Sequence, residues 1–111
     1  MKICCLSDLH GHYHYPELEE YINKSDVVVI AGDFSETYFS NNRSKIRWER
    51  TISRFENDTL EFLKSIRRPI VLVAGNHDYL LDRGKNPNAY YHEQLLREIP
   101  DLHYLNNQEL S

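Results

Sequence analysis

Three short polar clusters carry the residue types of a metal-dependent site. They read Asp8-Leu9-His10, Gly32-Asp33 and Gly75-Asn76-His77-Asp78. Carboxylate, imidazole and amide groups without a thiolate form a mixed oxygen and nitrogen ligand set, which suits Mn²⁺, Fe or Zn²⁺. Mg²⁺ is a further candidate, and Ca²⁺ fits less well. Bound metal ions would also let an acidic protein accept a phosphorylated substrate, because they supply the positive charge.

Each cluster follows an apolar run that predicts a strand. The runs cover Lys2–Leu6, Asp26–Ala31 and Ile70–Ala74, and the last two are rich in β-branched residues, as is typical of strands buried on both faces. Between and after them the spacing predicts helices over Pro16–Asn23, Ser44–Ile66 and Ala89–Ile99 and a further strand over Leu102–Leu105. This alternation predicts an α/β fold with a mainly parallel sheet and flanking helices.

The predicted fold brings the polar clusters together. In an open α/β sheet, ligands bind outside the carboxyl ends of the strands, so neighbouring parallel strands would direct their polar residues to one edge. Asp8 and His10 would alternate on an extended segment and face the same way. Gly32 and Gly75 lie where the chain must turn sharply and approach another group. Each cluster alone is compatible with an ordinary turn, but three in order favour a functional site. The expected site comprises Asp8, His10, Asp33, Asn76 and His77.

Composition limits the class of protein. The 111 residues allow one domain over 1–111, and 13 basic against 17 acidic residues give 13 − 17 = −4. No apolar run approaches a membrane span and the amino terminus does not read as a secretory signal, so we expect no membrane association. Adjacent Cys4 and Cys5 would point to opposite faces of a strand, which excludes a disulfide framework and fits a reducing, cytoplasmic location. The low pI disfavours nucleic-acid binding.

The three clusters resemble the leading signatures of the calcineurin-like metallophosphoesterase superfamily, D-x-H, G-D and G-N-H-[DE], in the same order. The resemblance covers about 3–105 and implies a layered sandwich with a mainly parallel sheet, of which this chain would form part. It also implies two divalent metal ions. Asp8 and His10 would bind one metal, Asp33 would bridge both, and Asn76 would bind the second.

The same resemblance implies a mechanism. A hydroxide held between the metals would attack a phosphomonoester or phosphodiester in line, and His77 would be the general acid that protonates the leaving oxygen. In the protein-phosphatase branch the second signature is G-D-x-x-D-R, whereas this chain reads Gly32-Asp33-Phe34-Ser35-Glu36-Thr37. Either Glu36 or Asp78 would then orient His77. The phosphorylated substrate and the oligomeric state are not readable from these residues.

The later signatures of the superfamily, a lone His and then G-H-x-H, have no counterpart after Asp78. His92 lies in a predicted amphipathic helix and His103 in a predicted strand, and we expect both to be ordinary residues. We therefore expect this chain to be the amino-terminal portion of such a domain. Two functions follow: a metal-dependent phosphoesterase, or a catalytically inactive remnant that binds metal or a partner. A nucleic-acid enzyme, with bases stacked on Tyr13-His14-Tyr15 or Tyr90-Tyr91, is a weaker third hypothesis.

Overall fold

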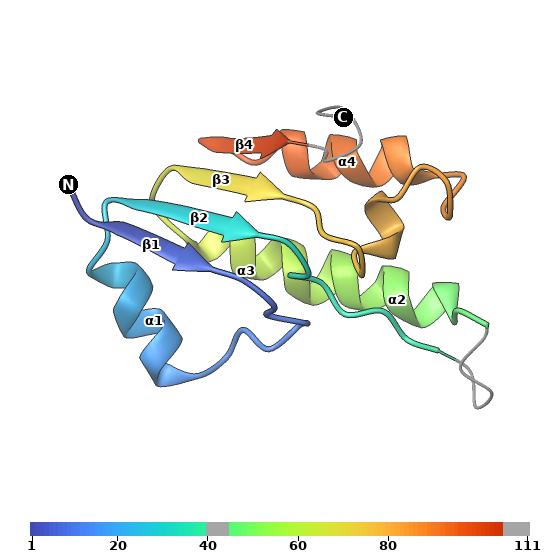
Figure 1. Ribbon diagram of the computed structural model, residues 1–111, viewed down its shortest axis with the longest axis horizontal. Coiled ribbons are helices and arrows are strands. Elements are labelled where there is room, and N and C mark those ends of the chain that lie inside the picture. Colours follow the sequence, from blue (N-terminus) through green and yellow to red (C-terminus); the bar gives the residue numbers. More distant parts are fainter. Residues whose placement is uncertain (40–44, 106–111) are drawn as a thin grey trace.

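A four-stranded parallel sheet organises the part of the chain that the structure describes. The computed structural model describes residues 1–39 and 45–105, and its strands are β1 (Ile3–Leu6), β2 (Val27–Ala31), β3 (Ile70–Val73) and β4 (Leu102–Leu105). The strands lie in the order β1-β2-β3-β4, and each pairs with its neighbour in parallel (Figure 1). The predicted α/β fold and the predicted strand over Leu102–Leu105 are confirmed.

The connecting segments are helical. The helices are α1 (Pro16–Asn23), α2 (Trp48–Arg54), α3 (Leu60–Ser65) and α4 (Ala89–Arg97), with a π-helical turn η1 (Phe55–Thr59) between α2 and α3 and a short 3₁₀ turn η2 (Tyr79–Leu81). Helix α1 begins at a proline in its first turn, followed by two glutamates that the helix dipole favours there.

The predicted helix over Ser44–Ile66 differs from the structure in two respects. Ser44 lies outside the described residues, and residues 45–47 are not helical, because Ile46 pairs with Phe39 in an isolated antiparallel bridge. Continuous helix runs from Trp48 to Ser65 and contains the π-helical turn, which apolar spacing alone does not reveal. Trp48 packs against the core.

Within residues 1–39 and 45–105, helices cover one face of the sheet and not the other. Val28, Ile30, Ile70 and Leu72 are at most 1% exposed. The residues that alternate with them on β2 and β3 are partly or fully exposed: Val27, Val29, Ala31, Val71 and Val73. The prediction that these strands are buried on both faces is therefore wrong for the described residues. Parallel crossovers are right-handed, so strands that follow one another in order send all their helices to the same side.

The two cysteines lie on opposite faces of the sheet. Cys4 points to the covered face and is 1% exposed, whereas Cys5 points to the other face and is exposed. Both are free thiols, as predicted. None of the helices within 1–39 and 45–105 is long and apolar enough to cross a bilayer.

Candidate metal centre

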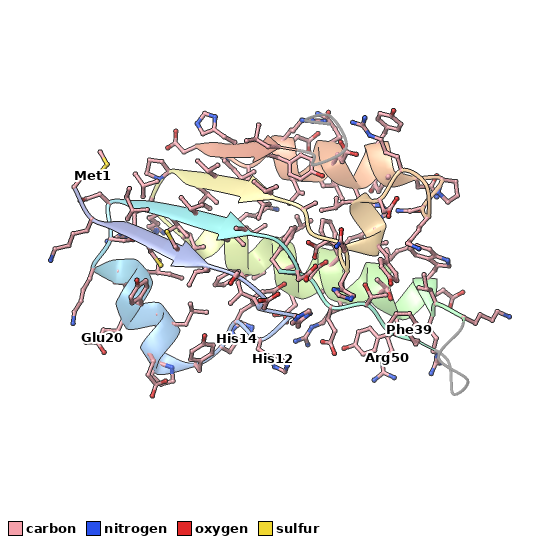
Figure 2. All side chains as sticks on the ribbon, viewed as in Figure 1. Met1, His12, His14, Glu20, Phe39 and Arg50 are labelled. Atoms are coloured by element: carbon pink, nitrogen blue, oxygen red, sulfur yellow. The ribbon has the colours of Figure 1, made fainter. Side chains whose placement is uncertain are left out.

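The predicted site residues follow β1, β2 and β3 at one edge of the sheet. The strand arrowheads point away from Met1 and toward the side of the molecule where Phe39 lies (Figure 2). The loop after β1 runs beside the loop after β2, since the backbone N–H of His10 donates to the Asp33 carbonyl (2.9 Å) and that of Gly11 donates to the Phe34 carbonyl (3.1 Å). Backbone pairing therefore sets where these side chains meet.

Asp8, His10 and Asp33 form a compact ligand set. One ligand atom from each lies within 4.8 Å of the others, and His10 Nε2 is 3.9 Å from Asp8 Oδ1. Bonds of about 2.0–2.2 Å from N and O ligands place two ligands of one ion at most about 4.4 Å apart. A shift of a few tenths of an ångström in exposed side chains would bring all three onto one ion. Two carboxylates and an imidazole also match the chemistry of a divalent transition metal, so the residues fit the predicted group.

All three ligand candidates have left-handed backbone conformations. Their φ angles are 54° for Asp8, 48° for His10 and 51° for Asp33, and Asp101 is the only other non-glycine residue with positive φ in the described ranges. Each such residue costs about 1–2 kcal/mol. Backbone strain of this kind clusters at functional sites, where the surrounding structure enforces it. The prediction that Asp8 and His10 share an extended segment is wrong; β1 ends at Leu6, and both residues lie in a strained loop.

The loops after β2 and β3 are in backbone contact. A Cβ atom placed on Gly75 would lie 2.5 Å from both the backbone N and the Oδ1 of Asp33, and 2.8 Å from the Cα of Gly32. Gly32 has a φ of 81°, which glycine adopts readily. The sharp turn and close approach predicted at these two glycines are confirmed.

A buried carboxylate joins the same two loops. Asp78 is 1% exposed, and its Oδ1 accepts hydrogen bonds from the backbone N–H (2.9 Å) and hydroxyl (2.8 Å) of Ser35. Its Oδ2 accepts from the backbone N–H of Gly75 (2.7 Å). Burial raises the pKa of Asp78 above its usual range, although the hydrogen bonds from Gly75 and Ser35 oppose the shift.

His77 is held against Asp33. Its backbone N–H donates to Asp33 Oδ1 (2.8 Å), and its ring Nδ1 lies 3.1 Å from Asp33 Oδ2. Partial burial raises the pKa of Asp33, but the hydrogen bonds from His77 and the charges of His77 and His10 outweigh it, so the pKa lies below its usual value. Thr37 also donates its hydroxyl proton to the His77 carbonyl (2.9 Å).

The sequence offered Asp78 and Glu36 as the residue that orients His77. In the described contacts, neither carboxylate bonds the His77 ring. Asp78 bonds Ser35 and Gly75, while Glu36 accepts from the Tyr38 hydroxyl (3.3 Å). Asp33 itself contacts the imidazole. Asp33 is thus both a candidate metal ligand and the partner of the His77 ring. The spacing of the motifs did not predict the second role.

Asn76 is exposed in the loop between Gly75 and His77, at the same edge. Its part as ligand to a second ion stays a prediction. The later histidines lie apart from the cluster: His92 is buried against Phe55 and bonds Asn86 (3.1 Å), and His103 is exposed on β4. Burial lowers the pKa of His92, although a hydrogen bond to Asn88 and the charge of Glu56 oppose the shift.

Arg54 supports the loop after β1. Its guanidinium pairs with the Asp58 carboxylate one helical turn along (3.0 Å). Arg54 is half-buried, and its guanidinium also donates to the Gly11 carbonyl (2.8 Å). The π-helical turn brings Thr59 to the Tyr13 hydroxyl of the same loop (2.9 Å). No motif signalled these contacts between distant segments.

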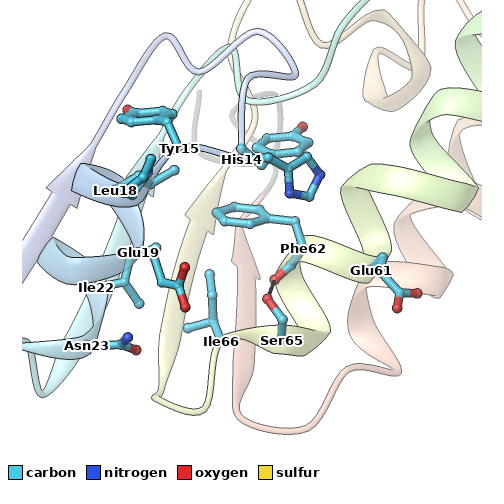
Figure 3. Close-up of a pocket in the computed structure, with 12 residues that line it drawn as sticks. His14, Tyr15, Leu18, Glu19, Ile22, Asn23, Glu61, Phe62, Ser65 and Ile66 are labelled. Carbon is cyan, nitrogen blue, oxygen red and sulfur yellow. Dashed lines mark hydrogen bonds between the residues drawn. The ribbon is translucent and has the colours of Figure 1, made fainter.

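Two cavities differ in their relation to this cluster. One of about 190 Å³ adjoins it and includes His10 and His77 in its walls. A larger one of about 520 Å³ lies between α1 and α3, with Tyr15, Leu18 and Phe62 in its walls (Figure 3). None of the ligand candidates lines the larger cavity, whereas His10 lines the smaller one.

The sequence model of a family described as calcineurin-like phosphoesterase matches residues 1–110. No curated protein matches the chain. The family match agrees with the motif resemblance.

Proposed function

Because the chain belongs to the calcineurin-like phosphoesterase family, we propose that it hydrolyses phosphate esters with a divalent metal ion held by Asp8, His10 and Asp33. The observation that carries the proposal is the convergence of three ligand atoms within 4.8 Å on three residues with strained backbone. A fold that needed only turns at these positions would not require carboxylates and imidazole in left-handed conformations.

The residues define how the metal would be held. Asp8, His10 and Asp33 would share one ion, and Asn76, on the adjacent loop, would contribute to a second ion together with Asp33. When bound, such ions lower the pKa of a water molecule and neutralise negative charge on phosphoryl oxygens. Mn²⁺, Fe and Zn²⁺ are the candidates because of the mixed ligand set.

His77 would supply the proton for the leaving group. As an imidazolium it donates from Nδ1 to Asp33 Oδ2, and the carboxylate stabilises its positive charge. Nε2 then carries the proton for the departing oxygen. The His77 side chain is 62% exposed at the edge of the small cavity, so a substrate can reach it. General acid catalysis of this kind contributes about 10²–10⁴-fold.

The test is hydrolysis of 4-nitrophenyl phosphate and bis(4-nitrophenyl) phosphate with Mn²⁺, Fe²⁺ or Zn²⁺. We expect His77→Ala to lower kcat by about 10²–10⁴-fold and Asp33→Asn to abolish turnover. His103→Ala, which removes an exposed imidazole from β4, is the matched control and should keep full activity. Full activity in both site variants would overturn the proposal.

One observation favours the second function, a metal- or partner-binding module without catalysis. The face of the sheet opposite the helices presents apolar side chains, including Ile3 at 55% and Leu105 at 42% exposure. A partner that covered this face would bury them. This function predicts metal binding with no turnover of either ester, so the same assay together with a metal titration separates the two.

A further inference from the structure

The small cavity beside the ligand set is lined by histidines at one end and by larger aromatic residues at the other. His10 and His77 form the end next to Asp33, and Phe39 and Tyr79 form the other. These residues come from three separate loops, after β1, after β2 and after β3. Phosphate at the ligand set would therefore direct its leaving group along the cavity wall, past the histidines toward the two larger rings.

The rings form a continuous row that leads away from the ligand set. Ring centroids are 6.0 Å apart for His10 and His77, 6.3 Å for His77 and Tyr79, and 5.9 Å for Tyr79 and Phe39. Tyr79 is fixed from one side by the Lys85 ammonium, 4.9 Å from its ring centroid. Phe39 stands perpendicular to Tyr79 at 89° and is 40% exposed, so part of its ring surface is open to a ligand.

Resting on the proposed function, we propose that this cavity selects phosphate esters whose leaving group is one aromatic ring. An apolar cavity of about 150 Å³ holds a benzene ring, so about 190 Å³ accommodates one ring and little more. Edge-to-face and offset contacts with centroids 4.5–7 Å apart are favourable for aromatic pairs. Phe39 and Tyr79 make such a contact with each other, and a ligand ring would add another on the exposed part of Phe39. Both are specificity-determining residues in this assignment.

The polar wall of the cavity adds a second criterion. The hydroxyl protons of Ser35 and Thr37 are already donated, to Asp78 and to the His77 carbonyl. These two hydroxyls, together with the Glu36 carboxylate, offer hydrogen-bond acceptors to a ligand. An aromatic leaving group with a hydrogen-bond donor fits this wall, whereas one with an anionic substituent would face the Glu36 carboxylate, whose charge Arg54 only partly offsets at 3.7 Å.

Direct binding tests the assignment without turnover. Phenylphosphonate, methylphosphonate and 4-carboxyphenylphosphonate are titrated calorimetrically into the Mn²⁺-loaded protein. We expect phenylphosphonate to bind most tightly of the three. Phe39→Ala and Tyr79→Leu should each lower the ratio of phenyl to methyl affinity by about 3- to 10-fold, the range expected for lost aromatic pairs. Tyr21→Ala, which removes an exposed tyrosine from α1, is the control and should leave the ratio unchanged.

The outcomes separate this inference from the proposed function. Binding of phenyl- and methylphosphonate with equal affinity, or an unchanged ratio in both Phe39→Ala and Tyr79→Leu, would overturn the aromatic assignment and leave the phosphoesterase proposal intact. Tighter binding of the carboxylated ligand would overturn the criterion set by Glu36. If Mn²⁺ binds but no phosphonate does, the proposed function fails and the inference fails with it. Thermal unfolding of each variant shows whether a lost ratio reflects loss of the fold.

Discussion

Replacement of Gly75 by alanine tests whether loop contact positions the ligand set. The new Cβ would lie 2.5 Å from the backbone N of Asp33, and ordinary contact begins near 3.4 Å, so the loops after β2 and β3 must separate by about 3.4 − 2.5 = 0.9 Å. Backbone atoms on both sides cannot rotate away, as the end of a flexible side chain could. Asp33 must therefore move relative to Asp8 and His10, or the loop that carries His77 must move.

The magnitude follows from that displacement. Overpacking of this size costs about 1–3 kcal/mol of unfolding free energy, and at about 4–8 °C per kcal/mol the melting temperature falls by roughly 4–24 °C. A misplacement of about 1 Å lowers the rate of hydrolysis on the order of 10²-fold. Mn²⁺ affinity is also expected to fall, since Asp33 leaves the compact ligand set.

Gly84→Ala is the matched control. A Cβ at Gly84 would meet only the Asp82 side-chain oxygen, at 3.3 Å, and the residue is exposed. The two variants are compared by thermal unfolding without metal and by calorimetric titration of Mn²⁺. The reasoning is refuted if Gly75→Ala matches Gly84→Ala in both melting temperature and Mn²⁺ affinity.

Three further predictions concern buried groups. Asp78→Asn replaces one carboxylate oxygen, an acceptor, with an amide donor that faces backbone N–H groups. Denaturant titration should therefore show an unfolding free energy lower by about 1–3 kcal/mol, and an unchanged value would contradict this prediction. One thiol, that of Cys5, should react quickly with Ellman's reagent in the native protein, and that of Cys4 only after unfolding; two fast thiols would be inconsistent with the structure. The lowered pKa of His92 means that the unfolded chain takes up a proton first as the pH falls below about 6.5, so stability decreases from pH 7 toward pH 5. His92→Gln should make that decrease shallower in melting-temperature measurements, and an identical profile would argue against it.

Local sequence patterns were sufficient to predict the strands and the edge of the sheet at which the polar residues lie. Apolar runs that end in polar clusters predicted three adjacent strands, and parallel pairing then required Asp8, Asp33 and His77 to meet. The same patterns did not predict that one face of the sheet is left uncovered in the described residues. A β-branched run such as Val27–Ala31 fits burial on two faces, but the number of covering layers depends on strand order and crossover hand, which are global properties.

Local sequence patterns also did not predict the backbone conformations and long-range contacts of the site. The left-handed conformations of Asp8 and His10 arise because the loop after β1 pairs with the loop after β2. The hydrogen bond from Arg54 to the Gly11 carbonyl joins residues 43 positions apart. Contacts of this kind depend on tertiary structure, whereas spacing within one segment describes only that segment.

The most direct measurement of the central claim is a calorimetric titration of the metal-free protein with Mn²⁺. The account predicts at least one ion bound per chain, with affinity at least 10-fold weaker in Asp33→Asn. Asp101→Asn is the control, because Asp101 is exposed and also left-handed but lies outside the ligand set, and it should bind Mn²⁺ as the wild type does. Absence of Mn²⁺ binding to the wild type, or equal affinity in Asp33→Asn and Asp101→Asn, would contradict the account.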